Sequence, residues 1–260
     1  MRPDIKAFIL YYFGDIIENS PWLKDLLTDP AVTAVTENDR PNNGLDEMGY
    51  SGLIKSAWGD LDLFSSIYYG PNPYPLIYVE DRGSVVALIK RNPNVSRFAG
   101  GGTYTWQNME FHGEILYNLA SDHTDDDYIS YVGGATLTDD WTALMLNIDQ
   151  VHWRLDWAGE IITSRQDAQG YYFSSDGIRP FTGDLLLQLL LQINPDLSLY
   201  YHMDLDFDHN AQYHRLGGTK RLIPGLTLDV KAEFFDGDDT SFIGLWRDND
   251  RVSCNLTYHF

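Results

Sequence analysis

The chain has 260 residues, one cysteine, and 18 Lys and Arg against 38 Asp and Glu, which gives a formal net charge of −20 at pH 7. This length suits one large domain or two small ones and is sufficient for a sizeable core. The acidic balance argues against nucleic-acid binding, the lone Cys254 excludes a disulfide scaffold, and no apolar run approaches the roughly 20 residues of a membrane-spanning helix.

Hydrophobic periodicity predicts that the chain is built of β-strands. In the clearest window, Leu197–Asp208, apolar residues alternate with residues that are mostly polar. Residues 109–119 and 250–260 show the same period of two, which belongs to a strand with two different faces and not to a helix. The predicted strands, in chain order, are 4–13, 48–58, 61–69, 96–106, 109–119, 127–137, 141–150, 182–193, 197–207, 213–223, 226–235 and 250–260.

The connections between these strands are of two kinds, short turns and long polar loops. Loops of about 30 residues are unusual in compact soluble domains. They are expected in outer-membrane barrels, whose strands of about 10 residues are joined by short periplasmic turns and long outer loops. If the last strand ends on the periplasmic side, every short turn falls on that side. The predicted long loops are 14–47, 70–95, 120–126, 151–181, 208–212 and 236–249.

Aromatic residues make up 14% of the chain, although its mean hydropathy of −0.30 is polar. Several lie near the ends of predicted strands, as the two interfacial belts of a membrane barrel require. Two alternatives are that aromatic residues simply favour strands and that the alternation belongs to a soluble β-sandwich. The aromatics at the short-turn ends are Trp58, Trp106, Trp141, Tyr258 and Phe260, and those toward the long-loop ends are Tyr11, Tyr12, Tyr69, Tyr117, Tyr128 and Phe235.

The last strand, Arg251–Phe260, resembles the terminal signature of Gram-negative outer-membrane proteins, an amphipathic strand that ends on Phe. This resemblance covers essentially the whole chain, since the other strands share the same alternation. It implies that Tyr258 and Phe260 belong to the signal that the barrel-assembly machinery reads.

A narrower resemblance covers Leu61–Leu119, about a quarter of the chain. The segments Ile67–Pro71, Arg97–Gly102 and Phe111–Glu114, together with Pro75, are similar to alginate-export-type and related porin-like barrels of proteobacteria. Members of that group are usually longer and carry a signal peptide. We therefore expect that an N-terminal portion is missing here.

Assigning the apolar faces to lipid places the charged faces around an enclosed aqueous space. A charge that faces lipid at mid-depth costs roughly 2–4 kcal/mol, so the inward orientation is nearly obligatory. Acids outnumber bases on these faces, which predicts a mildly cation-favouring lumen. Alternatively, the charges pair across strands and plug a narrow barrel. The predicted pore-lining residues are Lys6, Lys55, Asp62, Arg97, Glu110, His112, Glu114, Asp184, Gln188, His202, Asp204, Asp206, Asp229, Lys231, Glu233 and Arg251, with Gln192, Asn255 and His259 on the same faces.

Catalytic and metal-binding patterns are weak in this sequence. His112 and Glu114 form an H-x-E pattern, but the paired cysteines of a zinc deaminase are absent. The acidic run that follows His202 has a period of two and is the wet face of a strand. The acidic loops lack the twelve-residue spacing of a calcium-binding hand. We therefore expect no cofactor, no metal and no catalytic residue.

The sequence thus predicts an all-β protein, a single transmembrane antiparallel up-and-down β-barrel domain over residues 1–260, with about 12 strands or as the C-terminal part of a larger barrel. The predicted location is the outer membrane of a Gram-negative bacterium, and the predicted function is passive diffusion of small hydrophilic solutes. The expected partners are outer-membrane lipid, lipopolysaccharide and the barrel-assembly machinery. Two other functions stay open, a structural or adhesive barrel that binds partners through acidic loops, and a barrel enzyme on lipid or polysaccharide that uses Glu110 and Glu114.

Overall fold

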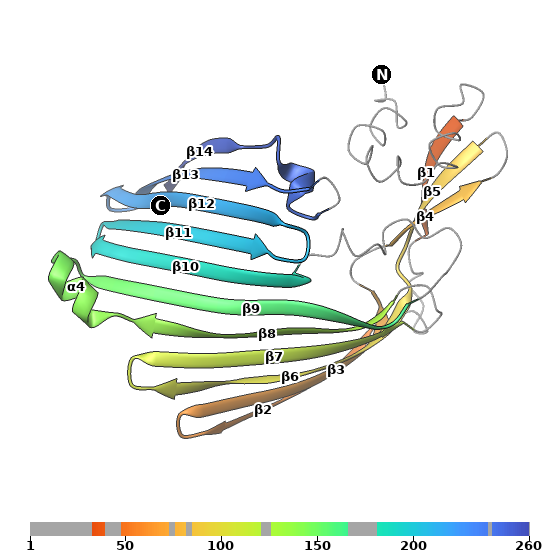
Figure 1. Ribbon diagram of the computed structural model, residues 1–260, viewed down its shortest axis with the longest axis horizontal. Coiled ribbons are helices and arrows are strands. Elements are labelled where there is room, and N and C mark those ends of the chain that lie inside the picture. The colour runs from red at the N-terminus through yellow and green to blue at the C-terminus, as the bar shows by residue number, and fades with distance from the viewer. Residues whose placement is uncertain are drawn as a thin grey trace.

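The computed structural model describes residues 33–39, 48–72, 76–81, 85–120, 126–165, 181–238 and 241–259 (Figure 1). These residues form an all-β protein in which eleven strands make one sheet and three make a second, smaller sheet. The large sheet contains β2 (Tyr50–Trp58), β3 (Leu61–Pro71), β6 (Asn94–Trp106), β7 (Met109–Ala120), β8 (Asp127–Thr138), β9 (Gln150–Ser164), β10 (Gly183–Asn194), β11 (Leu197–Asp206), β12 (Ala211–Ile223), β13 (Leu226–Asp236) and β14 (Arg251–Tyr258).

Neighbouring strands of the large sheet are antiparallel throughout, and almost all of them are also neighbours in the chain. The exception is β3, which pairs with β6, because two strands of the small sheet lie between them in the chain. In the small sheet, β5 (Val85–Arg91) lies between β1 (Thr33–Asp39) and β4 (Leu76–Asp81), parallel to β1 and antiparallel to β4. Strands β2 and β14 are the two edges of the large sheet, and within the described residues no pairing between them closes it into a barrel.

The two ends of the large sheet carry different connections. At one end, on the left in Figure 1, strands are joined by two-residue turns after Trp58, Trp106, Asn194 and Ile223. Gly225 in the last of these turns has φ +83, and a side chain there would meet the carbonyl oxygen of His259. The opposite end carries the excursion to the small sheet and the connections 165–182 and 237–250. Four of the five predicted short turns are therefore confirmed at this end, whereas the fifth, between β8 and β9, is a connection of residues 139–149 that contains a helix.

The predicted strand 141–150 is wrong, because this segment begins with the helix α4 (Asp140–Leu146). Asp139 caps the helix N-terminus by accepting hydrogen bonds from the amide and hydroxyl of Thr142, at 3.0 and 2.6 Å. Asn147, in the left-handed conformation with φ 54°, ends it. The strand itself comes later, as β9, within the predicted loop 151–181.

Other predicted loops also contain regular structure. Loop 70–95 includes β4, β5 and the start of β6, and loop 14–47 includes β1. The predicted long loop 208–212 is wrong, because only four residues separate β11 from β12. A three-residue 3₁₀ helix, η2 (Gly244–Trp246), lies in the connection before β14. The predicted strand 4–13, with Lys6, Tyr11 and Tyr12, and the terminal Phe260 lie outside the described residues.

The register divides the large sheet into two faces of opposite character. Across the strand pairs, one row of side chains joins Arg154, Gln188, His202, Arg215 and Glu233, and we call this side the polar face. The other side, the apolar face, carries large hydrophobic side chains that are exposed. These include Tyr50, Ile54, Trp58, Leu63, Ile67, Phe98, Tyr104, Trp106, Phe111, Ile115, Leu155, Trp157, Ile161, Leu199, Leu216, Val230, Phe234, Val252 and Leu256.

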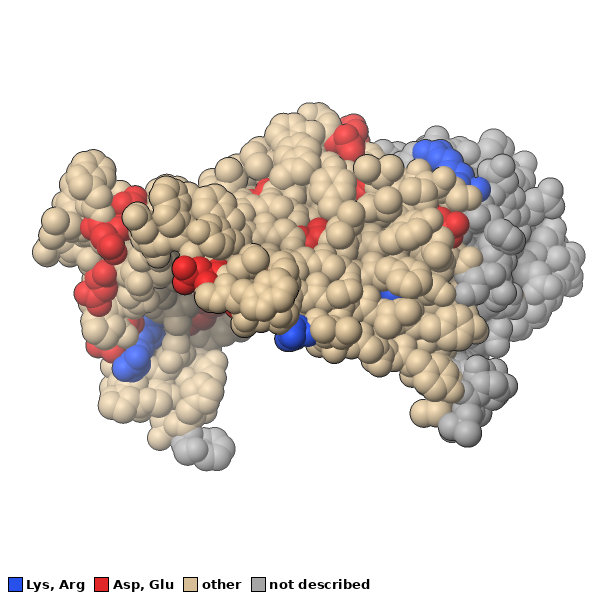
Figure 2. Space-filling view, turned by 90° about the horizontal axis from the view of Figure 1, so that it is seen from below, with Lys and Arg blue, Asp and Glu red and all other residues tan. Residues whose placement is uncertain are grey.

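The usual relation between burial and polarity is inverted in this sheet. Ile54 is 75% exposed, whereas Asp156 and Asp184 are only 3% and 2% exposed. The buried apolar residues among those described are few, and several of them are alanines. Figure 2 shows a surface with only scattered charged side chains. Among the described residues, neither α4 nor η2 is long and apolar enough to cross a membrane.

Candidate functional site

The predicted pore-lining residues that the structure describes all lie on the polar face. The pairing registers link Lys55 and Asp62 on β2 and β3, through β6 and β7, to Arg251 on β14, without a change of face. Their common face follows from the register. That this face lines a pore stays a prediction.

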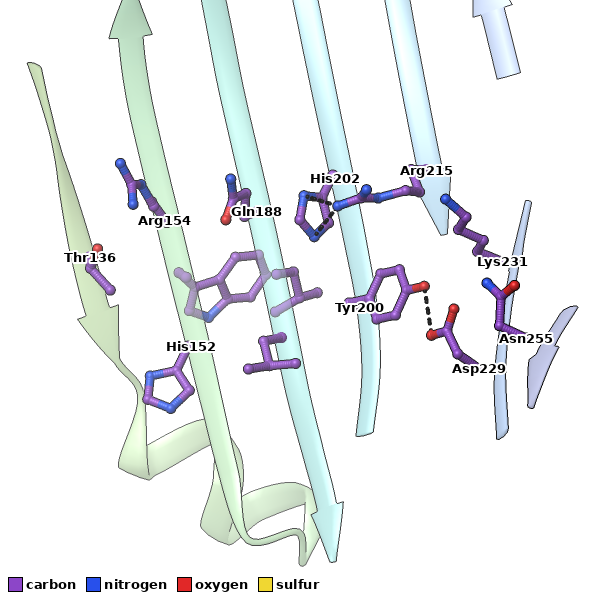
Figure 3. Close-up of a pocket in the computed structure, with 13 residues that line it drawn as sticks. Thr136, His152, Arg154, Gln188, Tyr200, His202, Arg215, Asp229, Lys231 and Asn255 are labelled. Atoms are coloured by element: carbon purple, nitrogen blue, oxygen red, sulfur yellow. Dashed lines mark hydrogen bonds between the residues drawn. The ribbon is translucent and has the colours of Figure 1, made fainter. Parts of the chain in front are cut away.

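A cavity of about 520 Å³ lies on this face between β8 and β14 (Figure 3). Cationic side chains from three strands, Arg154, Arg215 and Lys231, border it together with neutral hydrogen-bonding groups. We take this cavity as the candidate functional site. Its lining residues are Thr136, His152, Trp153, Arg154, Gln188, Leu189, Leu190, Tyr200, His202, Arg215, Asp229, Lys231 and Asn255.

Arg215 on β12 is the central cation of this cavity. Its Nη2 lies 3.1 Å from Nδ1 of His202, directly across the strand pair, and its guanidinium lies 5.7 Å from the centre of the Tyr200 ring. The Arg215 Nε is buried and has no hydrogen-bond partner. None of the ion pairs between described residues joins Arg215 to a carboxylate. Its guanidinium therefore contacts an imidazole and an aromatic face, and not a carboxylate of the described residues.

The acids beside Arg215 are already engaged by other donors. The Glu233 carboxylate accepts from Arg251 Nε at 2.7 Å and from the Tyr213 hydroxyl at 2.8 Å, and Lys231 Nζ lies 3.2 Å away. Asp229 accepts from the hydroxyls of Tyr200 and Thr219, at 3.1 and 2.9 Å. The cross-strand pairing considered as an alternative to transport is thus present between β13 and β14, while Arg215 stays outside it.

A second network crosses from β7 to β9 and fixes the other border of the cavity. The Asp156 carboxylate lies 2.5 Å from His112 Nε2 and accepts from Arg154 Nε at 2.6 Å. Arg154 Nη2 lies 3.2 Å from the same imidazole nitrogen. A side chain at Gly134, on β8 between them, would clash with the Asp156 carboxylate. Gly134 is therefore needed for the network to form.

Glu110 and Glu114, the pair considered for a barrel enzyme, lie on the same face of one strand but are separated along it. Glu110 and Glu114 lie four residues apart on β7, which places them about 13 Å apart along the strand. His112, which lies between them, is bound to Asp156 instead.

Two polar clusters mark the long-loop end of the same face. Arg97 donates to the side-chain oxygens of Asn118 and Asn72, at 2.8 and 2.9 Å. On β10 and β11, Asp184 lies directly opposite Asp206, and Asp204 lies two residues from Asp206 on the same face.

Asp206 beside them accepts from the amides of Asp208 and His209 and from the His209 ring. By register, these three aspartates lie nearer the long loops than the cations of the cavity do.

The sequence did not identify four residues that matter here: Arg154, Asp156, Tyr200 and Arg215. The first two were hidden because residues 151–181 were interpreted as a loop, although Val151–Ile161 alternates with a period of two. Tyr200 and Arg215 lie on strands that were predicted, and on their polar faces. Both residues could have been found from the alternation, by including every residue on the polar face of each predicted strand.

The aromatic belts are only partly as expected. Trp58, Trp106 and Tyr258 are exposed on the apolar face near the short turns. Tyr128 and Phe235, in contrast, pair with Asn118 and Tyr213 and so lie on the polar face. The ring of Phe235 packs against that of Tyr213, with centroids 4.9 Å apart. These two rings therefore do not belong to an outward-facing belt.

No family model matches this chain, and no curated protein matches it. Among solved structures, it is similar to a chain from a study on the mechanism behind the in-meso crystallization of membrane proteins. The two share 9% sequence identity and superpose with a TM-score of 0.35, over 80% of this chain and 73% of the other.

Proposed function

We propose that this chain forms a transmembrane β-barrel of about 12 strands in the outer membrane of a Gram-negative bacterium, and that it acts as a porin-like channel for passive diffusion of small hydrophilic solutes. One observation carries the proposal: the large sheet exposes its hydrophobic side chains and buries its charges. Large exposed apolar patches on proteins mark a contact with a partner or a membrane. With lipid on the apolar face and water on the polar face, the side chains on both sides of every strand would be in a favourable solvent.

The direction of curvature supports an enclosed polar space. On the inside of a curved sheet side chains converge and cover one another, whereas on the outside they diverge. Asn118, Asp156, Asp184 and Glu233 are all on the polar face and nearly fully buried, although most of their neighbours there are polar. Ile54 and Ile115 on the apolar face are 75% and 54% exposed. The polar face is therefore the inside of the curve.

Strand direction supports a further strand between the two edges. Both β2 and β14 run from the long-loop end toward the short-turn end, so direct pairing between them would be parallel. One strand of opposite direction would close the sheet with antiparallel pairs only and an even strand number, as in bacterial barrels. A strand over residues 4–13, as the sequence predicts, would have that direction if the chain led from it into the start of β2.

The charges of the polar face support a mild preference for cations. This face carries seven Lys and Arg and ten Asp and Glu, an excess of three acids. Transport would need no reaction step, no cofactor and no metal. The bases are Lys55, Arg97, Arg154, Arg215, Arg221, Lys231 and Arg251, and the acids are Asp62, Glu110, Glu114, Asp156, Glu160, Asp184, Asp204, Asp206, Asp229 and Glu233.

Membrane partners follow from the same proposal. Outer-membrane lipid and lipopolysaccharide would cover the apolar face, and Trp58, Trp106 and Tyr258 would lie in the interface on the periplasmic side. The barrel-assembly machinery would read the strand that ends at Tyr258.

The test begins with the purified protein in detergent. We expect the chain to need detergent, to show heat-modifiable gel migration, and to float with liposomes. In planar bilayers it should give stepwise conductance, and a salt gradient should give a small reversal potential of cation-selective sign. A protein that is soluble without detergent would overturn the membrane location. A protein that inserts but never conducts would overturn the channel and favour a structural barrel.

A further inference from the structure

One cation lies on the apolar face, and the proposed function does not use it. Lys220 on β12 is opposite Leu197 and Leu228, so its side chain leaves the sheet on the apolar side. Every other Lys and Arg of the eleven described strands lies on the polar face. Within the described part of the chain, the Lys220 ammonium has no carboxylate partner. An exposed, unpaired cation among hydrophobic side chains needs an explanation.

The depth of Lys220 makes its charge tolerable on such a face. It lies three residues before the end of β12, about 10 Å along the strand from the short turn. A Lys that faces lipid costs about 2–4 kcal/mol at mid-plane but only about 0–1 kcal/mol near the interface. From this position the flexible stem of Lys220 can follow the apolar surface while the ammonium reaches the headgroup region.

Lys220 also borders an apolar groove. A cavity of about 590 Å³ lies over β10 to β14 and is lined mainly by hydrophobic side chains, with Lys220 among the lining residues. Gly218 lies in it, two residues from Lys220 on the same face, between Leu199 of β11 and Val230 of β13. A Cβ atom at Gly218 would lie 2.7 Å from Leu199 Cδ2, so the absence of a side chain keeps this part of the groove open.

From this arrangement we propose that the groove over Gly218 and the ammonium of Lys220 form a binding site for one phospholipid of the leaflet at the short-turn end. The groove takes an acyl chain, and Lys220 pairs with the lipid phosphate. The occupant is identified by charge complementarity, because an acyl chain and an anionic phosphate match an apolar groove with one cation at its interfacial end. The inference rests on the proposed membrane location.

Lipid retention tests the site. The wild-type protein is titrated with phosphatidylglycerol in detergent and the 1:1 adduct is measured by native mass spectrometry. Lys220→Gln should weaken this adduct about fivefold, the effect of roughly one interfacial Lys on an anionic lipid. Arg221→Gln is the matched control, because Arg221 is the next residue, lies on the opposite face and is held by Asp196 at 3.4 Å. It should leave the adduct unchanged.

A second variant separates the groove from the charge. Gly218→Leu fills the groove and keeps the ammonium, and it should also weaken the adduct, provided that heat-modifiable migration shows a folded protein. If Lys220→Gln and Arg221→Gln retain lipid equally, the site is refuted. Displacement of the lipid by inorganic phosphate alone would overturn it in favour of a general anion site, and a dimer that forms instead of the adduct would overturn it in favour of a subunit contact. Flotation with liposomes, measured first on the wild type, reports separately on the membrane location.

Discussion

A lysine scan along β7 tests the apolar face most directly. The twelve residues of β7 extend about 40 Å, or about 28 Å across the membrane at a tilt of about 45°, close to the apolar band of about 25 Å that an outer-membrane barrel presents. Ile115 is near the middle of the strand on the apolar face and 54% exposed. Phe111 lies on the same face, four residues nearer the short turn and so about 9 Å closer to the interface.

The expected magnitudes follow from these depths. Relative to Ala at the same position, Lys at 115 should lower the free energy of unfolding by about 2–4 kcal/mol, a change of about 30- to 700-fold in the folding equilibrium, and Lys at 111 by about 0–1 kcal/mol. Leu116→Lys is the matched control, because Leu116 is adjacent but on the polar face, opposite Ser130. It should cost less than about 1 kcal/mol, since its ammonium would reach water.

The assay is reversible urea unfolding in phospholipid vesicles, followed by tryptophan fluorescence. A depth-dependent cost distinguishes a bilayer from every other covering of this face. If all three lysines cost about 0.5 kcal/mol or less, the apolar face is in water. If Lys at 111 costs as much as Lys at 115, the face packs against a second layer of protein. Either result refutes the reasoning.

Three further predictions concern the wall and the turn end. Arg215→Gln removes one of the seven bases of the polar face and raises the acid excess from three to four, so the cation-to-anion permeability ratio, measured from the reversal potential in a salt gradient, should increase. Gly134→Ala should lower the folded fraction on a heat-modifiability gel because its Cβ clashes with a β9 carboxylate, whereas Gly133→Ala, whose nearest neighbour is 3.9 Å away, should not. Hydrogen bonds from the Thr142 hydroxyl and amide lower the pKa of the Asp139 carboxyl. The cap therefore stabilises α4 fully above the ordinary pKa of a carboxyl, and this stabilisation is lost as the pH falls through the lowered pKa of Asp139. Amide exchange of α4 should show the loss, and Asp139→Asn should abolish the pH dependence of that exchange.

The faces of the sheet could be predicted because a strand alternates with a period of two. A shift of one residue would move every side chain to the other side, so a run such as Leu197–Asp206 leaves only one assignment for its charges. Pairing of charges across neighbouring strands, which was considered as an alternative to transport, follows from the same rule and is observed between Glu233 and Arg251. The period of two was therefore sufficient to predict that the charges share one face of the sheet.

The limits of the sequence lay where local and long-range signals compete. Residues 141–150 are rich in apolar side chains and were predicted to be a strand, although Asp139 before them can cap a helix. The stronger alternation that begins at Val151 then fell within a predicted loop. The pairing of β3 with β6 across the small sheet, and the engagement of His112 by Asp156 rather than Glu114, depend on contacts between distant segments. Periodicity contains no information on such contacts.

The two edges of the large sheet pose the remaining structural question, and the single cysteine gives a way to answer it. Cys254 lies on the edge strand β14, on the apolar face, and is exposed. If β2 paired with β14 directly, their Cα atoms would come within about 5.5 Å, inside the range of about 4.4–6.8 Å that a disulfide spans. With one strand between them the separation is about 9.6 Å, and no disulfide can form.

We therefore expect that single cysteines introduced on the apolar face of β2, at Gly52, Ile54 or Ser56, stay unlinked to Cys254 under mild oxidation of the folded protein in detergent. Three positions are tested because the structure does not define a register between the two edges. With a single position, a register shifted by two residues would place the new cysteine out of reach of Cys254 even if the strands paired. Val230→Cys is the positive control, since Val230 lies directly opposite Cys254 on β13 and should cross-link readily. Mass spectrometry of the monomer distinguishes a disulfide within the chain from one between chains. A link from any β2 position would mean that the edges pair in parallel and that eleven strands close the sheet without a twelfth.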